Sequence, residues 1–428
     1  FPNGIPSGGS SFTLVDHFLV YAFEDAQLGD IPCLVQIQAG TEEPFYNIEV
    51  ELDISLSLNQ YGFPVDEVQI KSSPLITDVD NNGLNEIFYG ADDGKVYGYM
   101  LAGYPQAGFP FEAEDNVRSS IAIGDVDSDG NNELVFGSYD NRLYIISALG
   151  QQEAVYWQPG IIEGPPALRD LDGDGDLEII FTTQNGSSGD LFAIHHNGED
   201  VAGFPAEIDE KMRVGPAVGD LDDDGVVDIV IVTWDDNIYA LDAFGNIKSG
   251  FPVTSTNRFN CAPTLADLDG NGTLEIIAGN DSGLLHVLFH DGSEMATFDT
   301  GDDIRGGISV SDLNNDGSLE ILFSGYDDMV HVWNPFSEEE LEGWPIDMGS
   351  NSLTGPITAD LDNDGDLEVI AAIKSGTVYV LHHDGSPFSG FPANLPGTIE
   401  STPAIGDLDE DNNYELIFGT TQGLQVLD

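Results

Sequence analysis

The sequence is poor in basic residues and in long apolar runs, and each shortage excludes a class of protein. Lysine and arginine number 11 against 77 aspartates and glutamates, which gives a formal net charge of −66 over 428 residues. Such a surface repels the phosphates of nucleic acids and of anionic membranes, so nucleic-acid binding is excluded. No apolar run approaches the length of a membrane span, so membrane insertion is excluded too.

Cysteine is also scarce. The two cysteines, Cys33 and Cys261, are too few for a disulfide scaffold or a zinc site, and we expect two unpaired, buried thiols. The chain begins at Phe1 without a signal peptide, so we expect a processed product or an excerpt of a secreted or cell-surface protein.

Helical periodicity is the third absence. No stretch keeps apolar residues at the helical spacing, whereas 50 glycines and 22 prolines suit many short strands joined by tight turns. The composition therefore predicts an all-β protein.

What the chain does have is an acidic loop that returns eight times. The loops begin at steps of 47, 45, 50, 47, 45, 48 and 47 residues, and each reads close to D-x-D-x-D-G-x-x-E before a strand-like run. A fixed period of this size is typical of repeat architectures, in which one unit buries its apolar face only against its neighbours.

Each repeat reads as four strands. In residues 71–118, KSSPLITDVD enters the loop, NEIFYG leaves it, KVYGYML follows a tight turn, and LAGYPQAGFPFEAE leads to a fourth strand. Four antiparallel strands per repeat are the unit of a β-propeller blade, so we predict an eight-bladed propeller over residues 59–428. Seven blades would require one loop to lie outside the ring, and the spacing singles out none.

The ring should be closed by an N-terminal strand. The last repeat stops after its third strand, and YGFPVDEVQI (61–70) matches segments such as SGFPVTST that end other blades. Residues 1–58 contain strand-like runs at 17–25, 31–40 and 46–58 but no acidic loop. We expect either part of a sandwich domain or a strand-donating arm for self-assembly.

The acidic loops are candidate sites for about eight Ca²⁺ ions, because this cation prefers six to eight oxygen ligands. Positions 1, 3, 5 and 9 would supply side chains and position 7 its carbonyl, while glycine at position 6 permits a positive φ. Three loops with asparagine for aspartate should bind more weakly. Since protein would fill every coordination position, we expect structural and not catalytic sites. The predicted ligands are Asp78, Asp80, Asn82, Leu84, Glu86, Asp125, Asp127, Asp129, Asn131, Glu133, Asp170, Asp172, Asp174, Asp176, Glu178, Asp220, Asp222, Asp224, Val226, Asp228, Asp267, Asp269, Asn271, Thr273, Glu275, Asp312, Asn314, Asp316, Ser318, Glu320, Asp360, Asp362, Asp364, Asp366, Glu368, Asp407, Asp409, Asp411, Asn413 and Glu415.

The loops, with FYGADDG, VFGSYDN and IFGTTQG after them, resemble the FG-GAP/VCBS repeats of integrin α-subunit propellers and of many secreted bacterial proteins. The resemblance covers residues 61–428. It implies a calcium-stabilised, extracellular propeller used for adhesion or ligand binding. Integrin α propellers have seven blades with calcium loops in only some of them, so integrin partners are not carried over.

A second feature lies seven residues before each loop, at the start of the innermost strand. This register should place eight side chains around one mouth of the central channel, on the face opposite the loops. Four of the 11 basic residues fall there, and Lys211 and Arg258 lie two residues earlier in their repeats. The eight positions are Lys71, Arg118, Glu163, Arg213, Asn260, Arg305, Leu353 and Glu400.

We predict that the mouth binds an anionic or polyhydroxyl ligand such as a glycan, or an acidic segment of a partner protein. The predicted binding residues are Lys71, Arg118, Arg213, Arg258 and Arg305. The alternative is that they only pair with glutamates and aspartates around a crowded channel. The paired histidines in HHNG and HHDG are interpreted as turn positions.

The sequence therefore favours a non-catalytic module for adhesion, ligand binding or surface assembly. No catalytic motif occurs, and we predict no catalytic residues. Two alternatives remain open: a polysaccharide lyase or glycoside hydrolase, and an accessory propeller of a secreted enzyme.

Overall fold

The computed structural model describes residues 29–39, 46–56, 59–60, 62–65, 68–408 and 413–428, with side chains from Asn59 onward. The chain divides into two compact units, Phe1–Asn59 and Gln60–Asp428. The predicted strand at 17–25 lies outside the described residues.

The N-terminal unit contains a two-stranded antiparallel sheet of β1 (Gly29–Ala39) and β2 (Tyr46–Leu56). The strands pair in unbroken register from Gly29 opposite Leu56 to Ala39 opposite Tyr46. They correspond to two of the three runs expected in this segment.

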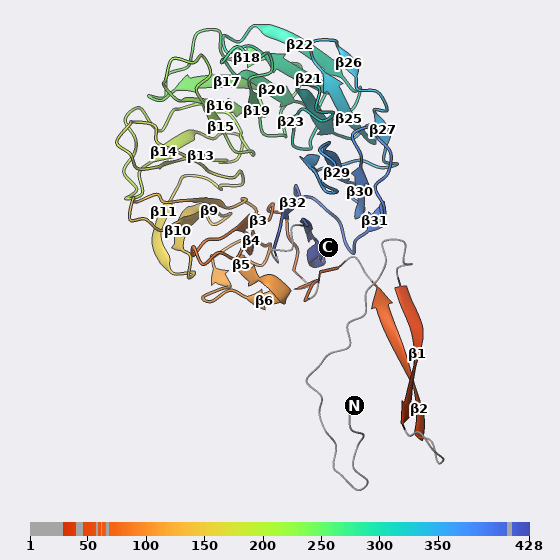
Figure 1. Cartoon of the computed structure of the whole chain (residues 1–428). Coiled ribbons are helices and arrows are strands. Elements are labelled where there is room, and N and C mark those ends of the chain that lie inside the picture. Colours follow the sequence, from red (N-terminus) through yellow and green to blue (C-terminus); the bar gives the residue numbers. More distant parts are fainter. Residues whose placement is uncertain (1–28, 40–45, 57–58, 61, 66–67, 409–412) are drawn as a thin grey trace. The chain divides into compact units, whose positions relative to one another are not determined.

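The second unit is an eight-bladed β-propeller, as the repeat predicted (Figure 1). The blades are numbered here in chain order by their acidic loops, from blade 1 with Asp78 to blade 8 with Asp407. Three-residue inner strands line the centre, and those of blades 1 and 8 contact each other. The inner strands are β3 (Leu75–Thr77), β8 (Ala122–Gly124), β12 (Ala167–Arg169), β15 (Ala217–Gly219), β19 (Thr264–Ala266), β23 (Ser309–Ser311), β28 (Ile357–Ala359) and β32 (Ala404–Gly406).

The second strand of each blade is buried along its whole length, because apolar side chains on both of its faces pack against neighbouring blades. Each begins at the ninth residue of the acidic loop, so the loop leads straight into the core. The second strands are β4 (Glu86–Gly90), β9 (Glu133–Gly137), β13 (Glu178–Thr182), β16 (Asp228–Val232), β20 (Glu275–Gly279), β24 (Glu320–Ser324), β29 (Glu368–Ala372) and β33 (Glu415–Thr420).

The third and outer strands complete the blades. The third strands are β5 (Lys95–Met100), β10 (Arg142–Ser147), β14 (Leu191–Ile194), β17 (Asn237–Asp242), β21 (Leu284–Leu288), β25 (Met329–Asn334), β30 (Thr377–Leu381) and β34 (Gly423–Leu427). The outer strands are β6 (Tyr104–Pro105), β7 (Phe111–Glu112), β11 (Gln152–Trp157), β18 (Val253–Thr254), β22 (Glu294–Asp299), β26 (Glu339–Glu340), β27 (Ile346–Asp347) and β31 (Ala393–Asn394). One short 3₁₀ turn, η1 (Leu101–Gly103), follows β5.

The predicted closure is confirmed. The Gln60 amide donates to the Val426 carbonyl at 2.9 Å, and Val65 forms an antiparallel bridge with Leu424 of β34. The chain around Phe63 thus supplies the fourth strand position of blade 8. Phe63 and Ile70 belong to one buried cluster with blades 1 and 8.

The core is distributed between blades and not gathered at one centre. A typical cluster joins Ile180 and Leu191 of blade 3 to Ile229 and Leu241 of blade 4, all nearly inaccessible to solvent. This is the mutual burial that the repeat requires. Within the described residues, no helix is long and apolar enough to span a membrane.

Candidate functional site

The acidic loops have a common hydrogen-bonded frame, which blade 2 illustrates. Asp125 accepts hydrogen bonds from the Asp129 amide at 3.0 Å and the Gly130 amide at 2.9 Å. Oε2 of Glu133 accepts a hydrogen bond from the Val126 amide at 3.0 Å. The loop backbone therefore orients the first and last carboxylates, and these same bonds recur in most other blades.

Glycine at loop position 6 has the expected positive φ, for example 92° at Gly130 and 96° at Gly272. Position 4 is also left-handed in the seven loops where it is described: it is glycine in two of them and serine, aspartate or asparagine in five, as at Ser128 and Asp223. Two left-handed residues within three positions make the turn tight enough to gather alternate side chains. Asp409, Asp411 and the remainder of 409–412 lie outside the described residues.

The ninth loop residue is buried in every blade, as at Glu275 and Glu368, which have no exposed surface. Burial, with a smaller contribution from nearby carboxylates, raises the pKa of Glu86 and of Glu133 to about 7. An amide hydrogen bond to each glutamate acts in the opposite direction. Burial likewise raises the pKa of Glu178 and Glu320. A buried carboxylate among like charges ionises readily only with a cation beside it.

The donor set fits a hard cation. In several loops, two aspartates and the glutamate each place one oxygen within 4.8 Å of the others, as Asp125, Asp127 and Glu133 do. In blade 5, Oε1 of Glu275 is buried and has no hydrogen-bond partner among the described residues. An unpaired buried carboxylate oxygen is costly, so a cation bound beside Glu275 would stabilise this loop.

Four histidines lie against loop carboxylates, which was not predicted from the sequence: His195, His196, His382 and His383. Nδ1 of His195 is 3.0 Å from Oε1 of Glu178, and Nδ1 of His382 is 3.0 Å from Oε1 of Glu368. Each follows a third strand and faces the buried glutamate across the ladder. The shared register of HHNG and HHDG was the available signal.

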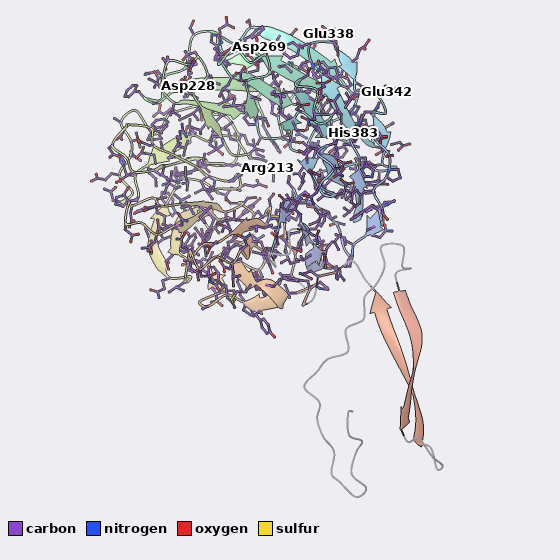
Figure 2. All side chains as sticks on the ribbon, viewed as in Figure 1. Arg213, Asp228, Asp269, Glu338, Glu342 and His383 are labelled. Atoms are coloured by element: carbon purple, nitrogen blue, oxygen red, sulfur yellow. The ribbon has the colours of Figure 1, made fainter. Side chains whose placement is uncertain are left out.

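Blade 4 differs from the rest. Nζ of Lys248 lies 2.5 Å from Oδ2 of Asp228 and 3.0 Å from Oδ2 of Asp222. Both carboxylates are predicted metal ligands, so an ammonium group already occupies part of this loop's ligand set. Asp228 is labelled in Figure 2.

At the other end of the inner strands lies a cavity of about 370 Å³. Arg213, which lines it, is labelled near the centre of the ring in Figure 2. All eight side chains that the register placed around one mouth line this cavity together with Val214: Lys71, Arg118, Glu163, Arg213, Asn260, Arg305, Leu353 and Glu400.

The lining cations form ion pairs. Lys71 Nζ lies 2.8 Å from Glu400 Oε2, and Arg213 makes a two-pronged contact with Glu163. Ion pairs with Glu163 and Glu400 were part of the alternative prediction, and both pairs are present in the structure.

The other two lining arginines use carboxylates outside the lining. Arg118 donates to both oxygens of Asp92, at 2.6 and 3.0 Å. Arg305 donates to both oxygens of Asp281, each at 2.9 Å. In each case the partner belongs to the preceding blade, so these contacts tie neighbouring blades together at the mouth.

An aromatic ring lies beside each lining arginine, always 21 residues later in the chain. Arg118 lies over Tyr139, Arg213 near Trp234, and Arg305 over Tyr326, at 4.9 to 5.3 Å from the ring centroids. Each ring lies just beyond the second strand of the arginine's own blade. A guanidinium held between a carboxylate and an aromatic face is fixed in orientation.

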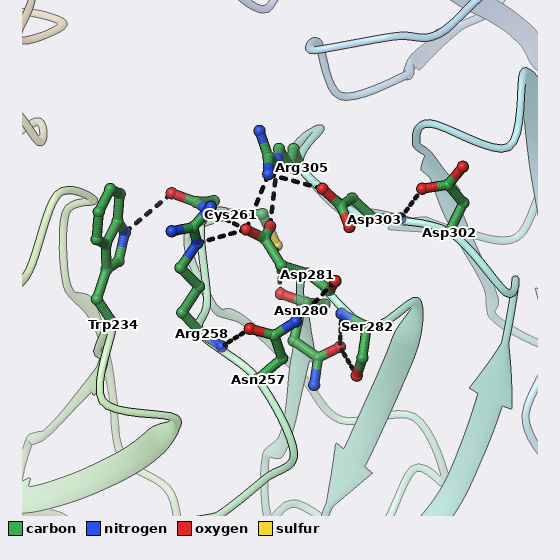
Figure 3. A network of polar contacts seen from close by, with 12 residues as sticks. Trp234, Asn257, Arg258, Cys261, Asn280, Asp281, Ser282, Asp302, Asp303 and Arg305 are labelled. Atoms are coloured by element: carbon green, nitrogen blue, oxygen red, sulfur yellow. Dashed lines mark hydrogen bonds and ion pairs between the residues drawn. The ribbon is translucent and has the colours of Figure 1, made fainter.

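Figure 3 shows the most connected part of the mouth, where Asp281 lies between Arg258 and Arg305. Asn260 Nδ2 also donates to Asp281, at 2.8 Å, and Asn260 Oδ1 accepts a hydrogen bond from Trp234 Nε1 at 2.9 Å. Burial raises the pKa of Asp281, but the hydrogen bonds from Arg305, Asn260 and Arg258 outweigh it and the net pKa is lowered. The predicted ligand residue Arg258 thus contacts the mouth residues through Asp281, although it does not line the cavity.

Lys211 joins this group from two residues before Arg213. Its Nζ lies 3.5 Å from the Trp234 ring centroid, and Arg258 lies over the same ring at 4.6 Å. Burial lowers the pKa of Lys211, and the guanidinium groups of Arg213 and Arg258 add to the lowering. Among the described residues, Lys211 has no carboxylate within ion-pair distance.

We define the cationic mouth by seven basic residues, out of 11 in the whole chain. Five carboxylates pair with them: Asp92, Glu163, Asp281, Asp303 and Glu400. These seven basic residues therefore outnumber the carboxylates paired with them by two, whereas the protein as a whole carries −66. The seven residues are Lys71, Arg118, Lys211, Arg213, Arg258, Arg305 and Lys374.

Solved structures with similar folds include BamB from Moraxella catarrhalis, at 19% identity and a TM-score of 0.57, covering 84% of this chain and 97% of that one. Sqt1 from Saccharomyces cerevisiae is 13% identical with a TM-score of 0.66, covering 87% and 99%. Quinohemoprotein alcohol dehydrogenase from Comamonas testosteroni is 12% identical with a TM-score of 0.58, covering 84% and 72%. At these identities the likeness shows the fold alone.

No curated protein sequence matches the chain. One family model does: residues 360–418, which contain the blade 7 loop and run through the inner strand of blade 8 into its second strand, match the FG-GAP-like repeat. Residues 360–418 are therefore similar to an FG-GAP-like repeat, and the eight-bladed antiparallel fold fits a propeller built from such repeats.

Proposed function

We propose that this protein is a non-catalytic, extracellular binding module, stabilised by calcium in its loops, that holds an anionic glycan at the cationic mouth. The observation that carries the proposal is the gathering of seven of 11 basic residues at one end of a strongly acidic ring. A local positive potential inside a negative surface attracts and orients an anion there and disfavours its binding elsewhere.

The chemistry of the cavity supports a sugar that bears a carboxylate or a sulfate. Its volume of about 370 Å³ lies in the range of small-ligand pockets, about 300 to 1,000 Å³. Arg118, Arg213 and Arg305 are held by carboxylates and aromatic rings and so need little reordering to bind. Asn260 and Glu163 offer hydrogen-bonding groups for hydroxyls.

The loop residues support the calcium part of the proposal. Their carboxylates lie near one another, their ninth residues are buried, and Glu275 has an unpaired buried oxygen. Calcium would supply the positive charge that lets these buried carboxylates ionise together. Loops with neutral asparagine donors suit the millimolar calcium found outside cells, where such sites bind with dissociation constants of about 10⁻⁴ to 10⁻³ M.

The enzymatic alternatives find less support. The described residues that line the cavity include neither histidine nor tyrosine, and both of its glutamates, Glu163 and Glu400, are in ion pairs. Lyase and hydrolase chemistry both need a free acid or base beside the substrate.

Calorimetric titration of a sulfated or uronate-containing oligosaccharide at low ionic strength tests the proposal, with the neutral parent sugar as a control. Lys211→Met should weaken binding about tenfold, because Lys211 contributes charge without a carboxylate partner to leave behind. Lys95→Met removes the same charge from the start of β5, where Lys95 pairs with Asp93, and should change nothing. Absence of binding by either anionic sugar, or equal binding by wild type and Lys211→Met, would overturn the proposal.

A further inference from the structure

The loop of blade 4 contains a cation of its own. The Lys248 ammonium contacts the carboxylates at loop positions 3 and 9, Asp222 and Asp228, at 3.0 and 2.5 Å. The Asp228 side chain is only 2% exposed and that of Lys248 only 18%, so both charges are largely withdrawn from water. Charges buried in this way persist only when they are paired.

The backbone position of Lys248 shows that the lysine is peculiar to this blade. Its amide donates to the Ala240 carbonyl of the third strand at 2.8 Å. Equivalent hydrogen bonds in other blades come from Val201 in blade 3, Leu341 in blade 6 and Phe388 in blade 7, which are apolar, and from the uncharged Gln106 in blade 1. None of these other residues carries a charge. In blade 4 the Lys248 side chain extends to the loop and places a positive charge there.

The loop itself is altered to match. Position 9 is aspartate in blade 4 and glutamate in the other seven blades. Asp228 still accepts the hydrogen bond from the amide at loop position 2, that of Leu221, at 3.2 Å. Its carboxylate is one methylene closer to its own backbone than a glutamate carboxylate would be. A shorter acid and a nearby lysine are two changes that favour the same arrangement.

We propose that Lys248 takes the place of the calcium ion in blade 4, so that the propeller binds calcium in its other loops and keeps this loop closed without metal. The inference rests on the proposed calcium loops and makes blade 4 their exception. A divalent ion entering this loop would have to displace the ammonium or lie beside it, and two like charges about 4 Å apart repel strongly in a partly buried site.

Hydrogen exchange measured by mass spectrometry on the whole protein, with calcium and after chelation, tests the inference without any mutation. Amides of 220–228 should keep their protection after chelation. Amides of 125–133 and 267–275 should lose at least about tenfold. Equal loss of protection in 220–228 would overturn the inference.

The converse experiment restores a metal site. The double variant Lys248→Val, Asp228→Glu gives blade 4 the residue types of blade 3, which has Val201 and Glu178 at these positions. Equilibrium dialysis against calcium should count one more ion per chain in this variant than in wild type. Lys95→Val removes a lysine far from any loop's position 9 and should add none. Because the variant is purified in calcium, its loop is not left with unpaired carboxylates.

The outcomes separate the two proposals. If wild type binds calcium but the double variant gains no ion, Lys248 does not replace the metal and only this inference fails. If neither protein binds calcium, the calcium loops themselves are refuted and this inference is refuted with them. One additional ion in the variant, with protected 220–228 amides in chelated wild type, supports both.

Discussion

The two ends of the inner strands have opposite electrostatic designs. At the mouth, each lining cation has a carboxylate of this same chain within contact, as Arg305 has Asp281. At the loops, carboxylates meet other carboxylates, and buried groups such as Glu275 lack a partner among the described residues. With so few basic residues, the chain pairs its lining cations with its own carboxylates at one end. At the other end we propose that an external cation pairs with the carboxylates, except in blade 4.

Removal of calcium should produce the largest effect, because it leaves the acidic loops of several blades without their cation at the same time. After chelation, the melting temperature followed by circular dichroism should fall by more than about 10 °C, since each site filled at 100 times its dissociation constant adds about 2.7 kcal/mol. Added calcium should restore the original value and magnesium should not. An unchanged melting temperature after verified ion removal would contradict the calcium loops.

The second prediction contrasts the two ends within blade 5. Asp281→Asn removes the buried carboxylate that holds Arg258 and Arg305, and should lower the free energy of unfolding by about 3 kcal/mol. The loss should be the same with and without calcium. Asp267→Asn, at the loop of the same blade, should destabilise the protein in calcium and have no such cost after chelation. Urea denaturation in both conditions measures the difference, and an equal calcium dependence for the two variants would refute the contrast.

The third prediction concerns the imidazolium of His331, which is paired with carboxylates of the same chain on a third strand, away from the mouth and the acidic loops. Burial lowers the pKa of His331, but hydrogen bonds with Asp327 and Glu340, at 2.7 and 2.6 Å, outweigh it and raise the pKa to about 9. A raised pKa stabilises the fold below the unfolded value near 6.5, and this contribution is lost as pH rises through about 9. We expect a loss of about 3 kcal/mol between pH 6 and pH 9.5.

His331→Tyr provides the matched control for this pH dependence. The same register position in blades 2 and 4 holds Tyr144 and Tyr239, whose hydroxyls donate to carboxylates. Urea unfolding in saturating calcium should show the extra pH dependence in wild type only. Identical pH profiles would show that the imidazolium does not contribute.

The smallest effect should come from loop charge. Asn271→Asp gives the blade 5 loop the aspartate that blade 2 has at the same position, and should tighten calcium binding there by about 1 kcal/mol, or several-fold. Calcium-dependent protection of 267–275 amides measures this affinity. Asn394→Asp adds the same charge on an outer strand of blade 7 and should leave it unchanged. A several-fold gain from the control too would point to net charge and not to the loop.

The blades, the closure and the eight mouth positions could be predicted because the repeats align residue for residue. A position seven residues before each loop maps to one place in every blade, so Lys71 and Arg305 could be grouped without a structure. Burial of position 9 also follows, since it opens a continuous apolar strand.

Glu163 and Glu400 share this register, but the other partners of the mouth cations could not be predicted in the same way. These lie just after the second strand, where the residue type changes from blade to blade, as Asp92, Tyr139 and Trp234 show. Lys248 was missed because it reaches its loop from the turn after the third strand, a contact across the sheet that no local spacing reports. The contact between His195 and Glu178 was not predicted for a similar reason, although an alignment of the third strands would have placed the two residues opposite each other.

Closure of the ring by the segment around Phe63 also constrains the order of assembly. Val65 and Leu424 meet although 359 positions separate them, so this contact has to await synthesis of the final blade. Until then the stacked rings of Tyr89, Tyr97 and Tyr99 on blade 1 lack their cover from blade 8. A nascent chain that stalls before blade 8 is made therefore exposes this aromatic surface, and synthesis of blade 8 provides the residues that cover it.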